Sequence, residues 1–242
     1  MKNKYFVLSK KVNVNMYNKY KKILTDVIFI SDTYPDILND DIIYYPDNQN
    51  LINLGYCNMH SHIKITSWDK VFYFFKNITL KDDTYYWIIE DDVFINKNKF
   101  DDFVYTLNNF NYDLLSFGWI NKFHDKWAWY DKYKTIVYDN FLEKNRMISI
   151  NQIIRISKNM INEIINLKNK INKFLFHEIL IYSICKQSNL THKQIKNDEI
   201  FITALEKNSI FNKKKIKNIQ KKIEFANKDS ILIHPFKYWY NI

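Results

Sequence analysis

The chain has 242 residues, of which 47% are hydrophobic and 17% aromatic, so it can fill a core and is not expected to be disordered. It contains only 2 Gly, which excludes a Gly-rich phosphate loop and a dinucleotide fingerprint, because both need clustered glycines. The 36 Lys and Arg against 26 Asp and Glu give a net charge of +10, which predicts a general affinity for anions, including nucleotides.

Five short apolar runs in the first 120 residues predict strands, at residues 4–9, 26–32, 42–45, 85–95 and 113–119. Between them, apolar residues at helical spacing predict helices at residues 16–24, 66–75 and 100–110. This alternation predicts an α/β fold with a mixed, mostly parallel sheet flanked by helices. In such sheets ligands bind at the carboxyl ends of the strands.

The second half of the chain has a weaker pattern. We expect an aromatic, charged loop at 124–138, strands at 147–156 and 231–239, and helices at 157–165, 176–184 and 213–222, the last exposed and rich in lysine. No internal repeat and no linker-like stretch is present, so we predict a single domain over residues 1–242.

The compartment is predicted from the cysteines and from apolar segments. Cys57 and Cys185 show no metal-type spacing and are expected to be free thiols in a reducing compartment. No apolar signal region follows Met1, and no apolar run approaches the roughly 20 residues of a membrane span. We therefore expect a cytoplasmic protein without a membrane span. Lys, Asn, Ile, Tyr and Phe dominate in the manner of an AT-rich genome, which also suits a viral protein in its host's cytoplasm.

Three consecutive carboxylates, Glu90, Asp91 and Asp92, follow the apolar run Tyr-Tyr-Trp-Ile-Ile. An unpaired buried carboxylate costs several kcal/mol, so acids do not normally interrupt a buried strand. Two carboxylates that converge at the end of a strand suit a hard divalent cation such as Mg²⁺ or Mn²⁺. The alternative is a solvated turn followed by a helix cap.

With these residues in place, the chain resembles a small glycosyltransferase of the GT-A type. The matching features are a two-stranded start, a Ser-Trp-Asp-Lys helix, and a hydrophobic strand running into Glu-Asp-Asp-Val-Phe-Ile; shorter matches lie at 151–157, 176–178 and 233–237. The Glu-Asp-Asp stretch is similar to the family's DXD motif, with Glu in place of the first Asp. The resemblance implies a Rossmann-like GT-A fold, with a nucleotide-sugar-binding half at 1–120 and an acceptor-binding half at 121–242.

The resemblance also implies a metal site. A bound Mn²⁺ or Mg²⁺ would neutralise the charge that develops on the diphosphate of a UDP- or GDP-sugar. Asp92 would bind the metal and be essential for catalysis, while Glu90 would contact the ribose or a metal-bound water. His234 would complete the metal shell, unless it is simply a surface histidine before Pro235. Lys237 would hold a phosphate as a point charge.

Donor and acceptor residues are implied in the same way. Asp32, Asp69 and Lys70, together with Asp91 of the motif, are candidates for binding the donor; for Asp69 and Lys70 the alternative is an ordinary exposed pair. In the inverting branch of the family a late carboxylate deprotonates the acceptor hydroxyl, and Glu178 is the candidate base. Its alternative role is to stabilise a helix N-terminus. The acceptor would be a glycan, a protein or a small molecule.

Some aromatic and histidine residues leave the choice open. Trp127 and Trp129 suit either a sugar-stacking platform or core packing. His60 and His62 resemble a zinc pair, but no Cys or acid lies at a helpful spacing, so a loop is the better interpretation.

Two other functions compete with sugar transfer. A nucleotidyltransferase-like enzyme would use the same carboxylates, but such enzymes usually carry a Gly-rich loop after the first strand, and residues 10–12 contain none. A basic nucleic-acid-binding protein would suit the charge of +10 and the lysines of 213–222. These lysines are not interleaved with stacking aromatics, so we expect no specific nucleic-acid partner.

Overall fold

The computed structural model describes residues 1–58, 65–171, 174–195, 201–203 and 231–234. It divides into two compact units, unit 1 with Met1–Glu90 and Tyr112–Ile195, and unit 2 with Asp91–Asn111 and Lys196–Ile242. The predicted single domain, with its halves meeting at residue 120, stays a prediction. His60, His62, Lys237 and the expected helix at 213–222 lie outside the described residues.

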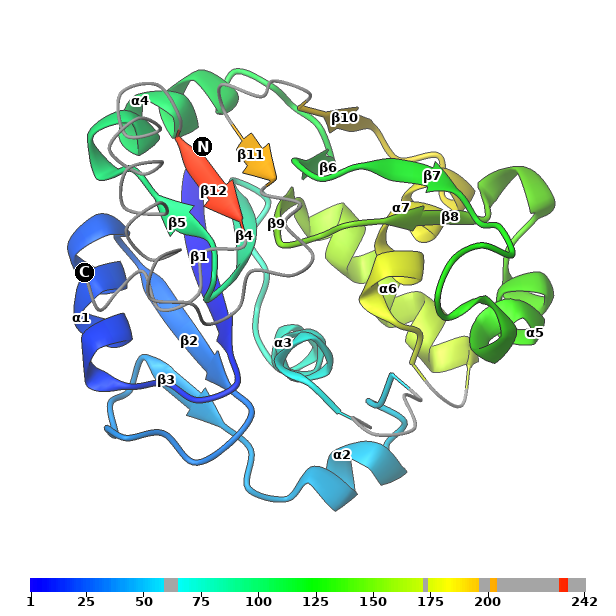
Figure 1. Ribbon diagram of the computed structural model, residues 1–242, viewed down its shortest axis with the longest axis horizontal. Coiled ribbons are helices and arrows are strands. Elements are labelled where there is room, and N and C mark those ends of the chain that lie inside the picture. The colour runs from blue at the N-terminus through cyan, green and yellow to red at the C-terminus, as the bar shows by residue number, and fades with distance from the viewer. Residues whose placement is uncertain (59–64, 172–173, 196–200, 204–230, 235–242) are drawn as a thin grey trace, which may run out of the picture. The chain divides into compact units, whose positions relative to one another are not determined.

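Unit 1 is built on a seven-stranded sheet with the order β10-β6-β9-β4-β1-β2-β3 (Figure 1). The strands are β1 (Lys2–Ser9), β2 (Val27–Ser31), β3 (Ile42–Tyr44), β4 (Thr84–Glu90), β6 (Leu114–Ser116), β9 (Ile153–Ile156) and β10 (His192–Gln194). Only β9 runs antiparallel to its neighbours β4 and β6 in this sheet; the other pairs are parallel. The prediction of a mixed, mostly parallel sheet with flanking helices is confirmed.

Helices of unit 1 cover both faces of this sheet. They are α1 (Val14–Ile23), α2 (Asn48–Asn53), α3 (Ser67–Lys76), α5 (Tyr130–Asn140), α6 (Lys158–Lys170) and α7 (His177–Gln187). The main core gathers Phe6, Ile88 and Ile154 with buried residues of α3, α6 and α7. Phe29 contacts Tyr17 and Tyr20 of α1, and it points away from that core because side chains alternate along a strand.

Local sequence explains where the best-defined helices begin. Thr66 and Asp69 form a reciprocal capping box at the start of α3, and the Ser157 hydroxyl accepts a hydrogen bond from the Met160 N–H at the start of α6. At the start of α1, the Asn13 side chain accepts from the Met16 N–H. These caps satisfy N–H groups that would otherwise lack an intrahelical partner.

Three sequence expectations are wrong in detail. The expected loop at 124–138 contains α5, which buries Tyr133 and Val137, one helical turn apart, among exposed polar residues. The expected strand at 147–156 is two strands, β9 and β8 (Met147–Ser149), and β8 pairs with β7 (Ile120–Lys122) in a separate sheet. The strand at 85–95 ends at Glu90, because Asp91 and Asp92 form a turn before β5 (Phe94–Ile95).

Both glycines occupy positions that are unfavourable for a side chain. Gly55 has a φ of 79°, a left-handed conformation that side chains with a Cβ disfavour. A Cβ on Gly118 would lie 2.2 Å from the carbonyl oxygen of Ile150. The backbone near the ends of β6 and β8 therefore approaches more closely than any side chain would permit.

Unit 2 contains a three-stranded sheet of order β11-β12-β5, formed by β11 (Phe201–Thr203), β12 (Leu232–His234) and β5. Strand β12 is parallel to β11 and antiparallel to β5. The unit also holds α4 (Lys97–Leu107), which buries Phe100, Phe103, Val104 and Leu107 as its periodicity predicts. Across the described parts of both units, we find no helix with the length and apolar character needed to cross a bilayer.

Candidate active site

Three neighbouring parallel strands of unit 1 end at the same edge of the sheet. In the order β4-β1-β2 they end at Glu90, Ser9 and Ser31. Asp32, a predicted donor-binding residue, follows β2 directly, and its N–H donates to the Ser9 carbonyl at 3.0 Å. The structure thus places Glu90 and Asp32 at the carboxyl edge where ligands of such sheets bind.

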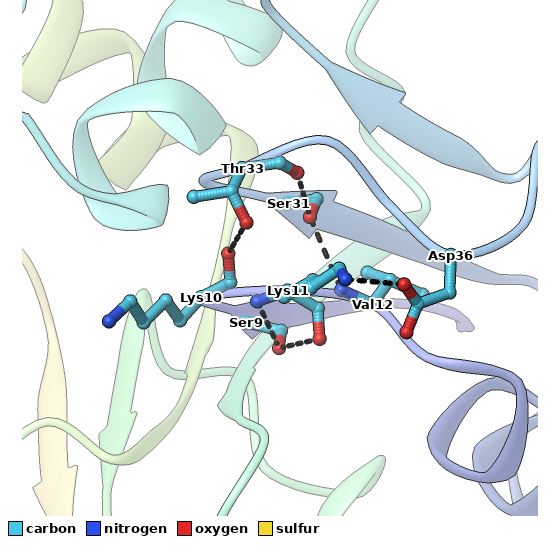
Figure 2. Close-up of polar contacts among 7 residues, drawn as sticks. All are labelled: Ser9, Lys10, Lys11, Val12, Ser31, Thr33 and Asp36. Atoms are coloured by element: carbon cyan, nitrogen blue, oxygen red, sulfur yellow. Dashed lines mark hydrogen bonds and ion pairs between the residues drawn. The ribbon is translucent and has the colours of Figure 1, made fainter.

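Hydrogen bonds fix the loops that leave β1 and β2, as Figure 2 shows. The Ser31 hydroxyl accepts from the Val12 N–H at 3.3 Å and donates to the Thr33 carbonyl at 2.7 Å. The Thr33 hydroxyl donates to the Lys10 carbonyl at 2.9 Å, while the Lys10 side chain extends away from this network. These bonds hold the two loops in one arrangement without the glycines that phosphate loops require.

Lys70 lies fully buried beside the same edge, with 0% of its surface exposed. Its ammonium donates to the carbonyl oxygens of Asp32 at 2.7 Å and Ser31 at 3.4 Å. Burial lowers the pKa of Lys70, while the nearby carboxyl groups of Asp32 and Asp69 raise it. Lys70 therefore anchors α3 to the end of β2.

Asp69 is also buried, with 2% exposed. Its carboxylate accepts hydrogen bonds from the Thr66 N–H at 2.7 Å, the Thr66 hydroxyl at 3.0 Å and the Asn58 amide at 3.2 Å. Burial raises its pKa to about 7 against these hydrogen bonds. The alternative of an ordinary exposed Asp69–Lys70 pair is wrong, and direct contact of either side chain with a donor stays a prediction.

Trp68 of α3 connects Glu90 with the start of α7. Its indole N–H donates to a carboxylate oxygen of Glu90 at 2.9 Å, and its ring stacks on His177 with centroids 4.4 Å apart and planes 7° apart. Burial lowers the pKa of His177 to about 3, so this imidazole is neutral at physiological pH. Trp68 thus fixes the orientation of the Glu90 carboxylate.

Glu178 stands in the first turn of α7, next to His177. Burial, with a smaller contribution from the charge of Glu90, raises its pKa to about 7 against a hydrogen bond with Trp127 that lowers it. A carboxyl group with a pKa near 7 can exchange a proton at physiological pH, which an ordinary surface glutamate cannot. The structure therefore brings Glu90 and Glu178 together within unit 1.

The start of α7 is itself held in place by the segment after β8. The Asn151 amide donates to the His177 carbonyl at 3.0 Å, and the Ser149 hydroxyl donates to the Glu178 carbonyl at 3.3 Å. Ser149 and Asn151 are both buried, and the single hydroxyl proton of Ser149 is shared between the Glu178 carbonyl and Oδ1 of Asn151, the nearer acceptor at 2.9 Å. This arrangement fixes the backbone that carries Glu178.

Unit 2 brings Asp92 and His234 together. The Nε2 atom of His234 lies 3.2 Å from Oδ1 of Asp92, and the two side chains are 15% and 17% exposed. The pairing of β5 with β12 explains this proximity, because Phe94 lies opposite Ile233, one residue before His234. A bond from the Asn96 N–H to the Ile231 carbonyl at 2.9 Å extends the pairing.

The donor set suits a divalent metal. Asp92 and His234 of unit 2 offer a carboxylate and an imidazole, both of which bind divalent metals. Within the described part of the chain, Oδ1 of Asp92 is buried and accepts no hydrogen bond, although it lies near Nε2 of His234. Adjacent ligands of an octahedral ion at about 2.1 Å lie about 3 Å apart, close to this separation. Glu90 precedes Asp92 by two residues, so the chain keeps their Cα atoms within about 7 Å.

Sequence reasoning missed several residues that shape the site. Trp68 was included only in the predicted helix at 66–75 and its Ser-Trp-Asp-Lys stretch, and no role was predicted for Asn58 or Tyr133. Tyr133 is fully buried and its hydroxyl donates to the Asn58 carbonyl. The signal that was available is chemical, because a buried indole N–H or phenol O–H must find an acceptor.

Trp127 is 9% exposed and packs against Tyr133 and Phe176, which favours core packing over a sugar platform.

Comparison with known proteins finds similarity in structure but not in sequence. No family model and no curated protein matches the chain. It is similar to the galactosyltransferase LgtC in complex with donor and acceptor sugar analogues (11% identity, 84% of this chain and 76% of that chain covered, TM-score 0.46). It is also similar to an active-site mutant of LgtC (11% identity, 96% of this chain and 86% of that chain covered, TM-score 0.48). A third similar structure is mouse xyloside xylosyltransferase 1 (7% identity, 96% of this chain and 97% of that chain covered, TM-score 0.42).

Proposed function

We propose that this protein is a metal-dependent glycosyltransferase of the GT-A type. It moves a sugar from a UDP- or GDP-sugar donor to a hydroxyl of a glycan, a protein or a small molecule. The observation that carries the proposal is the distance of 3.2 Å between Nε2 of His234 and Oδ1 of Asp92. Asp92 lies two residues after Glu90, the last residue of β4.

In this proposal Asp92 and His234 hold Mn²⁺ or Mg²⁺, and Glu90 contacts the ribose or a metal-bound water. When bound, the ion supplies positive charge that offsets the negative charge developing on the leaving diphosphate. The Trp68 N–H, bonded to Glu90 at 2.9 Å, keeps this carboxylate in place before the donor arrives. Lys237 holds a phosphate as a point charge.

The donor's nucleoside occupies the carboxyl edge of β1 and β2. Asp32 contacts the base or ribose, and Asp91 of the acidic motif completes the donor site. Lys70 and Asp69 act beneath it, because the Lys70 ammonium bonds the Asp32 carbonyl at 2.7 Å and Asp69 caps the helix that carries Lys70. A crevice at the carboxyl ends of parallel strands is the usual place for a nucleotide in an open α/β sheet.

Glu178 acts as the general base that takes the proton of the acceptor hydroxyl. Its pKa near 7 leaves a substantial ionised fraction at physiological pH and gives the carboxylate more affinity for a proton than an exposed glutamate has. A base that activates the acceptor for direct displacement inverts the anomeric configuration. NMR of the first product formed, before mutarotation, reports that configuration.

Metal-dependent nucleotide binding tests the proposal most directly. We expect titration calorimetry to show binding of UDP or GDP that depends on Mn²⁺, and electron paramagnetic resonance to show bound Mn²⁺ without any donor. Asp92→Asn removes a charged ligand, so we expect at least a tenfold loss in both measurements.

Asp101→Asn is the matched control, because Asp101 is an exposed aspartate on α4 of the same unit. It should bind Mn²⁺ and nucleotide as the wild type does. If Asp92→Asn also binds Mn²⁺ and nucleotide as the wild type does, the assignment of the metal site to Asp92 is wrong. In an assay with intact donor, release of UDP or GDP rather than pyrophosphate separates sugar transfer from nucleotidyl transfer.

A further inference from the structure

Unit 1 contains a hollow whose lining residues have no role in the proposed active site. It has a volume of about 670 Å³ and is lined by Lys122, Phe123, Tyr138, Leu142, Glu143, Lys144 and Arg146. We refer to these residues as the basic hollow. They come from the end of β7, from α5 and from the segment that contains the short 3₁₀ helix η1 (Glu143–Asn145) (Figure 1).

The three cations of the basic hollow, Lys122, Lys144 and Arg146, have little neutralising charge around them in the part of the chain that the structure describes. Among the described residues, no carboxylate forms an ion pair with Lys122, Lys144 or Arg146. Three cations against the single carboxylate of Glu143 leave the hollow positively charged. An unpaired group of cations around a concavity raises the local concentration of anions.

Arg146 is held in place for such a ligand. Its guanidinium lies 4.2 Å from the centre of the Tyr138 ring, and its Nε–H donates to the Phe141 carbonyl at 3.0 Å. A second, weaker bond reaches the Tyr138 carbonyl at 3.5 Å. A guanidinium carries five N–H donors, so most of them stay available to a carboxylate or phosphate while the planar group is already oriented.

Aromatic and aliphatic surface accompanies the charges. The ring of Phe123 packs edge-to-face with that of Tyr138, with ring centroids 6.3 Å apart, and the hydroxyls of Tyr130 and Tyr138 are joined by a hydrogen bond. Tyr138 and Leu142 are 44% and 62% exposed. A water molecule takes up about 30 Å³, so the volume of the hollow is far larger than a small inorganic anion needs. It falls within the roughly 300–1,000 Å³ that is usual for small-molecule pockets.

We propose that the basic hollow binds an acidic saccharide, a chain of sugar rings that carries carboxylate or phosphate groups. Lys122, Lys144 and Arg146 bind the anionic groups, and Phe123 and Tyr138 contact the apolar faces of the rings. The choice of a saccharide over other anions rests on the proposed glycosyl transfer, for which the hollow holds a distant part of the acceptor. Single-stranded nucleic acid fits less well, because it needs a succession of open aromatic faces. The hollow offers the half-buried Phe123 and the single face of Tyr138 that Arg146 does not cover, which is enough for a sugar ring but not for a row of stacked bases.

Binding measured without donor and without metal tests this site separately from transfer. The probes are trigalacturonate for carboxylates, glucose 6-phosphate for a phosphate, and maltotriose, inorganic phosphate and a single-stranded oligonucleotide as comparisons. We expect trigalacturonate or glucose 6-phosphate to bind more tightly than maltotriose and than inorganic phosphate. The combined variant Lys122→Gln and Lys144→Gln should weaken that binding about tenfold, since each exposed charge contributes up to about 1 kcal/mol.

The matched control is Lys22→Gln with Lys170→Gln, which removes two exposed lysines elsewhere in unit 1 and should bind as the wild type does. Phe123→Leu should weaken saccharide binding and leave phosphate binding unchanged. The proposal is overturned if maltotriose or inorganic phosphate binds as tightly as the acidic saccharides, if the oligonucleotide binds more tightly, or if the hollow variant binds them undiminished. All these variants keep Asp92 and Glu178. A result that overturns saccharide binding at the basic hollow would therefore leave the proposed transfer reaction untouched.

Discussion

Two groups of charged side chains in unit 1 differ in their contact with water. Around the carboxyl edge of the sheet, burial raises the pKa of Asp69 and Glu178 to about 7 and lowers that of Lys70. In the basic hollow, Lys122 and Lys144 are exposed. Charges removed from water change their proton affinity and respond strongly to their neighbours, whereas charges in water contribute little individually. The first group is therefore suited to chemistry, and the second to holding a ligand through many weak contacts.

The largest expected effect is on catalysis at the buried group. Glu178→Gln removes the proposed base and keeps its shape, so we expect the rate of transfer to fall about 10²- to 10⁴-fold while donor binding is kept. Glu143→Gln, the same change in the basic hollow, should alter the rate less than twofold at saturating acceptor, because the hollow is proposed only to hold a distant part of the acceptor. Transfer assays with saturating donor compare the two variants. Equal rates for Glu178→Gln and the wild type would place the base elsewhere.

The next effect is on stability. Lys70→Met leaves the Asp32 and Ser31 carbonyls without their buried donor, and we expect the free energy of unfolding to fall by about 2–4 kcal/mol. Lys122→Met, an exposed lysine, should change it by less than about 0.5 kcal/mol. Urea denaturation followed by tryptophan fluorescence measures both. Similar values for the two variants would contradict the distinction between the groups.

The smallest expected effect is a pH dependence that only the buried group shows. The pKa of Glu178 is raised from 4.5 to about 7, so the folded state keeps this proton over a range in which the unfolded state has lost it. The contribution of Glu178 to stability is therefore present below pH 4.5 and is lost as pH rises through about 7. The free energy of unfolding of Glu178→Gln, relative to that of the wild type, should therefore be about 1–2 kcal/mol more favourable to the variant at pH 8 than at pH 5.

Thermal or urea unfolding at the two pH values measures this difference. Glu143→Gln again serves as the comparison, because it makes the same change at an exposed glutamate of unit 1. A flat profile for Glu178→Gln would show that the carboxyl group is not desolvated in the folded protein.

Elements with a strong pattern could be predicted from the sequence. The buried runs that became β1, β2 and β4, and the apolar stripes of α3 and α4, agree with the structure. Strands β7 and β10, with the sequences Ile-Asn-Lys and His-Lys-Gln, could not be predicted in this way. They are polar and only three residues long, so their pairing with neighbouring strands decides their conformation, and that information is not local.

The candidate site was predictable only where chemistry is visible in a short stretch. The acids at 90–92 stand out after a buried strand, and Glu178 stands at the start of a helix. The burial of Asp69 and Lys70 could not be deduced, because adjacent opposite charges are typical of an exposed helix start. The role of Trp68 depends on Glu90 and His177, which are far away in sequence and meet only in the folded protein.

Gly118 bears on how the chain has been allowed to change. In a protein of 242 residues with only 2 glycines, one has a left-handed backbone and the other lies where a methyl group would overlap the Ile150 carbonyl. The two glycines thus stand where the backbone geometry disfavours a side chain. In distant relatives we expect glycine at these two positions after most of the surrounding sequence has diverged, which makes them reference points for aligning such sequences.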